Sequence, residues 1–424
     1  MKLNYKRTIL VGFAFFIISA FWQAYDTIVP LILTNKFLMK QGDSGMIMAL
    51  DNVFAVFLLP IFGNLSDRTR SRFGRRTPYI VCGTVAASIA FVALGFAPSL
   101  LTFILILLAC LLSMATFRSP AVALMPDVTV KPLRSKGNAI INLMGTAGGI
   151  LVLLLADPFK TSEPGKTDFS LYIVAVVGIM LLGLVTFIFT VREKQWVADM
   201  EQESLSVVDE EEKERKTAGG KLSRQQMTSL LLILASVALW YIGYNAVTSK
   251  YSVYATDILH MSYSTTLLIA QGAAIVSYIP VGLVASRIGR RRTILAGVAM
   301  LTTAFGAAFF IDQNTPPILM TVLFALAGIA WATINVNSFP MVVELASGGD
   351  VGKYTGFYYT ASMSAQIVTP VLSGYLMDHI GMREVFFPYA AIACACAFVT
   401  MFFVRHGDAK PAPKQGLAAL DVDD

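Results

Sequence analysis

The stretch GNLSDRTRSRFGRRTPYI, from Gly63 to Ile80, places five arginines in one short polar segment between long apolar runs. Of the 424 residues, 56% are hydrophobic and only 14% are charged, whereas soluble domains carry about 25% charged residues. Apolar runs of the length that crosses a bilayer, about 18 residues or more, recur from one end of the chain to the other. The composition therefore predicts a polytopic membrane protein, and the arginine-rich stretch is a loop between two of its spans.

The apolar runs predict twelve transmembrane helices and no sheet. Breaks between them are marked by charged or turn-forming segments, such as the turn around Pro98. The predicted spans are 8–34, 44–65, 79–97, 99–126, 135–157, 169–191, 226–252, 264–286, 293–311, 316–343, 354–377 and 385–405.

The Lys and Arg residues fall mainly on one side of this topology. With the N-terminus inside, 26 of the 33 lie in inner segments and 5 lie in outer loops. The positive-inside rule then predicts that both termini are cytoplasmic and that the protein is a multi-pass protein of the plasma (inner) membrane. The same bias explains the net charge of +6 without a nucleic-acid partner, so the simplest role of the 63–80 loop is to set topology.

The loop occurs a second time as GLVASRIGRRRTIL, from Gly282 to Leu295, with four fewer residues between its glycines. Outside that difference a constant offset of 219 relates Tyr25 to Tyr244 and Ser119 to Ser338. The repeat predicts two homologous six-helix domains at 1–191 and 226–405, a cytoplasmic linker at 192–225 and a disordered tail at 406–424.

Two repeated six-span halves and a loop of the G-x-x-x-D-R-x-G-R-R type resemble the major facilitator superfamily (MFS). The longer first copy, with its Arg-Arg-x-Pro ending, resembles the sucrose/proton symporters and the wider glycoside–cation symporter group, which includes the melibiose carrier. The resemblance implies an all-α membrane protein with twelve transmembrane helices in two six-helix pseudo-symmetric bundles around a central cavity. It implies a secondary active transporter and not an enzyme, working by alternating access as a monomer in the lipid bilayer.

Charged residues at the inner ends of the predicted spans form a candidate gate. Asp67 ends the second span, where it can bind arginines of its own loop or the N-terminal end of a helix in the other half. Exposed pairs of this kind contribute only about 0–1 kcal/mol each, which suits a latch that must reopen. The predicted gating residues are Asp67, Arg68, Arg75, Asp127, Arg134 and Glu344.

Ionisable residues inside an apolar span are costly and mark function by default. Three stand out, Asp26, Asp51 and Arg118, and at the offset of 219 their counterparts are neutral: Asn245, Ala270 and Asn337. The coupling chemistry is therefore expected in the N-terminal half. Lys250, near an outer span end, is expected to extend to the membrane interface.

Asp26 and Asp51 are the predicted proton-coupling residues, because burial favours the neutral form of a carboxyl and exposure to water favours the charged form. Each has a structural alternative. Asp26 would only accept hydrogen bonds from Thr27, Tyr25 or a broken turn near Pro30; Asp51 would be an outer-rim residue; Arg118 would clamp a kink at Pro120.

A sugar substrate needs aromatic faces for its ring and amides or carboxylates for its hydroxyls. Both types gather in the predicted spans 1, 7, 10 and 11. The predicted substrate-binding residues are Trp22, Gln23, Tyr25, Asp26, Asn52, Arg118, Trp240, Tyr241, Tyr244, Asn245, Asn337, Tyr358 and Gln366.

The chain departs from its relatives at positions that decide the coupling ion. Where the melibiose-type carriers place cation-binding carboxylates on helix 2, this chain has Ala55 and Leu59; where plant sucrose symporters carry an acid and an arginine, it has Leu111 and Val122. Asp26 and Asp51 then become the substitutes, with the proton as coupling ion and sodium less favoured.

The sequence thus predicts proton-coupled symport of a disaccharide or related glycoside, with no metal and no cofactor. The alternatives within transport are a sodium-coupled glycoside symporter and a drug/proton antiporter. From another class, the alternatives are an uncoupled lipid translocator and a sensor on a carrier fold. No nucleotide-binding or metalloenzyme motif is present in the chain.

Overall fold

The structure is a computed structural model that describes residues 3–130, 134–159, 168–205, 223–343, 345 and 351–407. It is built from helices, and by contacts it divides into two compact units. The first unit holds Met1–Met39 and Leu50–Val208, and the second holds Lys40–Ala49 and Asp209–Asp424. The boundary between the units thus runs through one long helix as well as through the linker.

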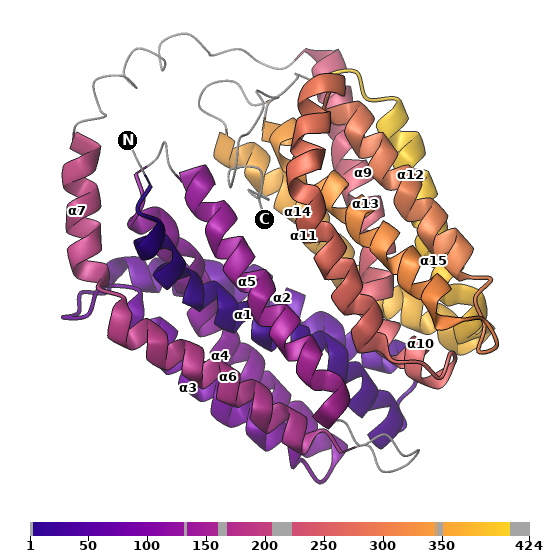
Figure 1. The fold of residues 1–424 in the computed structure, drawn as a ribbon, viewed down its shortest axis with the longest axis horizontal. Coiled ribbons are helices and arrows are strands. Elements are labelled where there is room, and N and C mark those ends of the chain that lie inside the picture. The colour runs from indigo at the N-terminus through magenta and orange to yellow at the C-terminus, as the bar shows by residue number, and fades with distance from the viewer. Residues whose placement is uncertain are drawn as a thin grey trace. The chain divides into compact units, whose positions relative to one another are not determined.

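The first unit contains six long helices and a shorter one (Figure 1). Asn4 and Ser99 accept backbone hydrogen bonds that begin the first and fourth of them. The helices are α1 (Tyr5–Leu31, continued by a π-helical turn at Ile32–Lys36), α2 (Gln41–Arg68), α3 (Thr77–Gly95), α4 (Leu100–Asp127), α5 (Arg134–Phe159), α6 (Ser170–Thr190) and α7 (Glu193–Leu205). Helix α1 packs against α5 and α6, and α3 packs against α4 and α6.

The second unit contains another six long helices and one short helix that follows α9. They are α9 (Arg224–Thr248), α10 (Tyr251–Asp257), α11 (Tyr263–Ile288), α12 (Arg290–Ala308), α13 (Pro317–Val343), α14 (Val351–Ile380) and α15 (Met382–Phe402). Helix α13 packs against α11 and α12, and α15 packs against α9 and α12. Within the described ranges, each of the twelve predicted spans therefore coincides with a long helix.

Eight of the helices are long and apolar enough to cross a membrane by length and composition, and the core of α5 is a shorter apolar segment. The internal repeat is visible in the backbone as well. Gly74 before α3 and Gly289 before α12 both have a positive φ, 119° and 93°, a conformation that glycine adopts without strain. Both copies of the arginine-rich loop thus contain a glycine with positive φ shortly before the next helix.

The first turns of α2 are held within the second unit by two charged side chains. The Asp378 carboxylate of α14 accepts hydrogen bonds from the backbone N–H groups of Gln41 (2.7 Å) and Gly42 (2.6 Å). Lys250 is fully buried, and its Nζ donates to the backbone oxygen (2.8 Å) and Oε1 (3.1 Å) of Gln41. The expectation that Lys250 extends to the membrane interface is therefore wrong, because α9 ends at Thr248 and the chain turns Lys250 inward.

Candidate functional site

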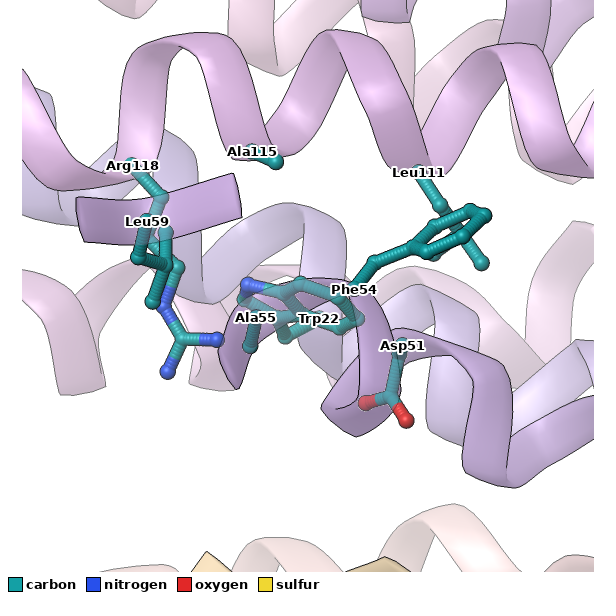
Figure 2. A pocket seen from close by; sticks show the side chains of 8 residues that line it. All are labelled: Trp22, Asp51, Phe54, Ala55, Leu59, Leu111, Ala115 and Arg118. Atoms are coloured by element: carbon teal, nitrogen blue, oxygen red, sulfur yellow. The ribbon is translucent and has the colours of Figure 1, made fainter. Parts of the chain in front are cut away.

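A small pocket in the first unit is lined by side chains from three helices (Figure 2). Helix α1 contributes Trp22, and the other lining residues come from α2 and α4: Asp51, Phe54, Ala55, Leu59, Leu111, Ala115 and Arg118. Two of the three charges predicted at membrane depth therefore line the same pocket.

The two charged groups flank an aromatic ring. Trp22 lies between Arg118 and Asp51 in Figure 2, and the Arg118 Cζ lies 5.4 Å from the centroid of the Trp22 ring, within the range of a cation–π interaction. Asp51 Oδ1 accepts hydrogen bonds from the backbone N (2.6 Å) and Nδ2 (2.7 Å) of Asn52. The buried Trp22 Nε1 has no hydrogen-bond partner within the described ranges, so the pocket holds a donor that a polar ligand can satisfy.

Asp26, one turn after Trp22 on α1, belongs to the same electrostatic network. It interacts with the charges of Asp51 and Arg118. The hydrogen bonds proposed as its structural alternative are not made among the described residues: Thr27 Oγ1 donates to the Gln23 backbone oxygen at 2.6 Å, and the Tyr25 hydroxyl has no partner. Three ionisable groups, two acidic and one basic, are therefore coupled in this unit.

The aromatic neighbours of the pocket support its wall. Tyr25 is fully buried, stacked on Phe21 at 6.0 Å and edge-on to Trp22 at 5.3 Å. Gln23 is half-buried and donates to Thr27 Oγ1 at 3.3 Å. Of the α1 residues predicted to bind substrate, Trp22 lines the pocket in this structure and Tyr25 packs behind it.

In the second unit the predicted aromatics converge on a tryptophan that the sequence analysis did not single out. Tyr244 stacks face to face on Trp331 with ring centroids 3.6 Å apart and an interplanar angle of 6°, and Tyr241 meets the same ring edge-on at 5.3 Å. All three are half-buried. This aromatic cluster (Tyr241, Tyr244, Trp331) presents partly exposed rings of the type that contacts the apolar face of a sugar.

The remaining predicted residues of the second unit are bonded mostly to their own helices. Trp240 is fully buried and its Nε1 has no partner in the described part of the chain. The polar side chains bond as follows: Asn245 to the Tyr241 oxygen (2.9 Å), Asn337 to the Thr333 oxygen (3.0 Å), Tyr358 with Ser338 (3.0 Å) and Gln366 to the Ser362 oxygen (3.4 Å). To bind a ligand with the same donors, these amides must rotate away from the backbone.

At the end of the first unit that is predicted to be cytoplasmic, Arg76 joins three helices. Its guanidinium binds Asp67 at the end of α2, and its Nε donates to Asp127 Oδ2 at the end of α4 at 2.8 Å. Arg75 pairs with the other oxygen of Asp127 at 2.7 Å. Partial burial lowers the pKa of Arg75, but the hydrogen bond and charge of Asp127 outweigh it and raise the pKa overall, so Arg75 stays charged.

Of the other predicted gating residues, Arg68 has a described side chain. Arg68 is exposed and forms no ion pair with any residue of the described ranges. The Arg134 side chain and Glu344 lie outside what the structure describes. Arg76 connects Asp67 to Asp127, and Arg75 pairs with Asp127; the gating role of Asp67, Arg75 and Asp127 stays a prediction.

A carboxylate from the predicted linker caps α3. Glu193 Oε1 accepts from the backbone N–H groups of Arg75 (2.7 Å) and Arg76 (2.8 Å), and Oε2 accepts from Thr77 N and Oγ1, both at 2.7 Å. The residue is 1% exposed. Negative charge at a helix N-terminus is stabilising, so Glu193 ties α7 to the start of α3.

Comparison with known families decides the class. The model of a family described as MFS/sugar transport protein matches residues 10–351. The chain belongs to this family.

Relatives and solved structures agree with that assignment. The MFS protein described here is 23% identical over 411 residues to an uncharacterized MFS-type transporter of Methanocaldococcus jannaschii, covering 94% of this chain and 95% of the relative. It is similar in fold to the inward-open xylose transporter of E. coli, with a TM-score of 0.71 and 13% identity over 98% of this chain and 99% of that one. A bacterial homologue of the human lysosomal transporter Spinster gives a TM-score of 0.71 at 12% identity, covering 95% and 97%.

Three residues of this MFS transporter emerged only from the structure. Trp331 is one of many aromatic residues in the apolar spans. Its stacking on the ring of Tyr244 sets it apart from the others. Arg76 and Arg75 are adjacent arginines of the same loop, and the sequence does not tell them apart. They differ in their ion-pair partners, since Arg76 also binds Asp67. Glu193 lies in a charged segment predicted as linker, where the sequence does not reveal the α3 N-terminus that it caps.

Proposed function

We propose that the protein is a proton-coupled symporter of a disaccharide or related glycoside that works by alternating access in the plasma (inner) membrane, with both termini cytoplasmic. The observation that carries the proposal is the coupling of Asp26, Asp51 and Arg118 around the Trp22 pocket. Charges at membrane depth are retained where they move an ion or bind a substrate.

The charge balance of these groups favours one proton per transport cycle. Two ionised carboxylates beside one guanidinium carry a net charge of −1, which is costly to enclose at membrane depth. A single proton on either carboxyl brings the three groups to neutrality. Proton binding therefore favours the occluded form, and release to water restores the charged form.

The lining of the pocket disfavours sodium. Ala55 and Leu59, the α2 positions where the resemblance to melibiose-type carriers expects cation-binding carboxylates, present apolar side chains to the pocket. Hard cations are held by several oxygen ligands, and these two positions supply none. A proton needs only a basic carboxylate, which Asp51 and Asp26 provide.

Each unit carries side chains of the types that bind sugars. Trp22 offers a ring and an unsatisfied indole N–H in one unit, and the aromatic cluster Tyr241, Tyr244 and Trp331 offers rings in the other. Asp51 and Asn52 add hydrogen-bonding groups beside Trp22. The family described as MFS/sugar transport protein is consistent with a small sugar-like substrate.

The test is uptake of labelled sucrose, maltose and melibiose into proteoliposomes that contain the purified protein. An inward proton gradient without sodium should drive accumulation of at least one of them, and a proton ionophore should abolish it. Accumulation that needs a sodium gradient and ignores the proton gradient would identify a sodium symporter. Proton-driven expulsion of drugs without sugar uptake would identify an antiporter.

A further inference from the structure

A second groove of about 430 Å³ lies at the inner end of the first unit, away from the transport pocket. Arg72 and Phe73 of the loop between α2 and α3 form one side of it. The junction of α6 and α7, which includes Val191, Arg192 and Lys194, forms the other side. The groove therefore begins where the apolar helix α6 leaves the membrane.

The groove has an excess of positive charge. Arg72, Arg192 and Lys194 are exposed, and none forms an ion pair with another residue in the described ranges. The Arg72 guanidinium lies 4.6 Å from the centroid of the Phe73 ring, which holds it at the groove. Three cations thus line one groove without an acidic partner among the described residues.

The one carboxylate in the lining does not neutralise them. Both oxygens of Glu193 are occupied by the N-terminus of α3, with four hydrogen bonds of 2.7–2.8 Å. Glu193 is 1% exposed, and its charge is compensated by the N-terminus of α3. An anionic group is needed to complement the three cations.

Exposed apolar side chains, one in the groove and one in the last turn of α6, indicate the source of that anion. Phe73 is 57% exposed and Phe189, in the last turn of α6, is 81% exposed. A free phosphate gains nothing from such rings, whereas the acyl chains of a lipid cover them. Basic pockets beside membrane helices on the inner side are suited to anionic lipid head groups.

We propose that this groove binds the phosphate head group of an anionic phospholipid. Arg72, Arg192 and Lys194 contact the phosphate, and the exposed phenylalanines contact the chains. Because Glu193 in the same groove caps α3, the bound lipid stabilises the junction between α6, α7 and the arginine-rich loop. The inference stands independently of the transported substrate.

The experiment titrates delipidated full-length protein with phosphatidylglycerol, phosphatidylcholine or inorganic phosphate and counts bound lipid by native mass spectrometry. The wild-type protein should retain phosphatidylglycerol about tenfold better than phosphatidylcholine, since each cation near an anionic surface contributes a several-fold preference. The triple variant Arg72→Gln/Arg192→Gln/Lys194→Gln should lose the preference. The matched control Lys6→Gln/Arg70→Gln/Arg224→Gln removes the same charge from exposed positions outside the groove and should keep it.

Equal preference in the triple variant and the wild-type protein would overturn the proposal. Displacement of phosphatidylglycerol by inorganic phosphate at comparable concentration would also overturn it, because the groove would then be a free-phosphate site. Raising the ionic strength on the unaltered protein gives a check that needs no variant. Screening should reduce the preference, and a preference indifferent to salt would contradict the role of the cations.

Discussion

Asp26 and Asp51 carry charges of the same sign, and Arg118 is the cation that interacts with both. Because like charges disfavour one another at low dielectric, protonation of one carboxyl favours the charged form of the other. We therefore expect the pair to act as one proton-binding unit. Their effect on transport should therefore be shared and non-additive.

Asp26→Asn and Asp51→Asn should each abolish proton-driven accumulation of sugar. Asparagine keeps the size of the side chain but cannot bind and release a proton. The carrier without sugar is then expected not to return to its starting state, so net transport stops. Counterflow exchange of labelled for unlabelled sugar should persist in at least one variant. Measurement of both rates in proteoliposomes tests this, and two variants with normal accumulation would refute the assignment.

Trp331→Ala should weaken sugar binding without altering proton dependence. Loss of an aromatic contact costs about 1 kcal/mol, which is roughly fivefold in apparent affinity. Trp331→Phe retains a ring against Tyr244 and serves as the matched control. The apparent KM for sugar entry measures the effect, and an unchanged KM in the alanine variant would remove Trp331 from the sugar site.

The sequence singled out the charged residues of the first unit but not Trp331 in the aromatic cluster of the second unit. Asp26, Asp51 and Arg118 stand out because a charge in an apolar span has a cost that function must explain. Trp331 carries no such cost, and aromatic residues fill many membrane helices for packing alone. Only the 3.6 Å stack on Tyr244 identifies it.

At the scale of helices, the bond between Glu193 and the N-terminus of α3 organises the inner end of the first unit. Helix α7 is also held by Arg7, whose guanidinium lies 5.7 Å from the Trp196 ring and donates to the Trp196 backbone oxygen. The predicted linker thus begins with a helix docked at two points. The sequence predicted a cytoplasmic linker at 192–225 but not this docking, because a charged segment carries no signal for the helix end that it meets.

Glu193→Gln should lower the thermal stability of the purified protein. The amide replaces one charged acceptor with a donor, and hydrogen bonds to charged groups contribute about 1.5–3 kcal/mol. Glu384→Gln, an exposed acid in the first turn of α15, is the matched control and should have a much smaller effect. Thermal unfolding in detergent compares them, and equal Tm values for the two variants would contradict the role of Glu193 as a cap.

Asp378→Asn should release the start of α2 from α14. The Asp378 carboxylate accepts both first-turn amides, from Gln41 and Gly42, and an asparagine oxygen accepts them more weakly. With about 1.5–3 kcal/mol lost, amide exchange at these two residues should speed up by roughly 10- to 100-fold. Hydrogen exchange followed by mass spectrometry measures it.

Asp312→Asn is the control for that experiment, because Asp312 bonds only to its own turn, at Asn314 and Thr315, among the described residues. It should leave exchange at Gln41 and Gly42 unchanged. Unchanged exchange in Asp378→Asn as well would show that the close packing of α2 and α14, and not the carboxylate, holds this segment.

At the scale of the whole molecule, the twelve-helix fold was predictable because each span is defined by its own apolar length and needs no long-range information. The repeat was predictable too, and the positive φ of Gly74 and Gly289 gives it a structural basis. Two local details, the helix α10 and the position of Lys250, were not predictable. The short helix α10 lies partly within a predicted span, and Lys250 turns inward between α9 and α10 because of a partner about 200 residues earlier in the chain.

The two halves of the chain differ in chemistry although they share a fold. The first unit carries two carboxyls and a guanidinium, and the corresponding positions of the second unit carry Asn245, Ala270 and Asn337. On this asymmetry rests our proposal that the first unit carries proton coupling and that the second supplies neutral contacts.

The most direct test is to follow the external pH of lightly buffered proteoliposomes when the transported sugar is added outside. Symport predicts that the external pH rises as sugar enters, with one proton removed from the medium for each sugar taken up. The Asp26→Asn/Asp51→Asn double variant should give no pH change. Sugar entry at the normal rate without alkalinisation, or with alkalinisation that survives the loss of both carboxyls, would contradict the account.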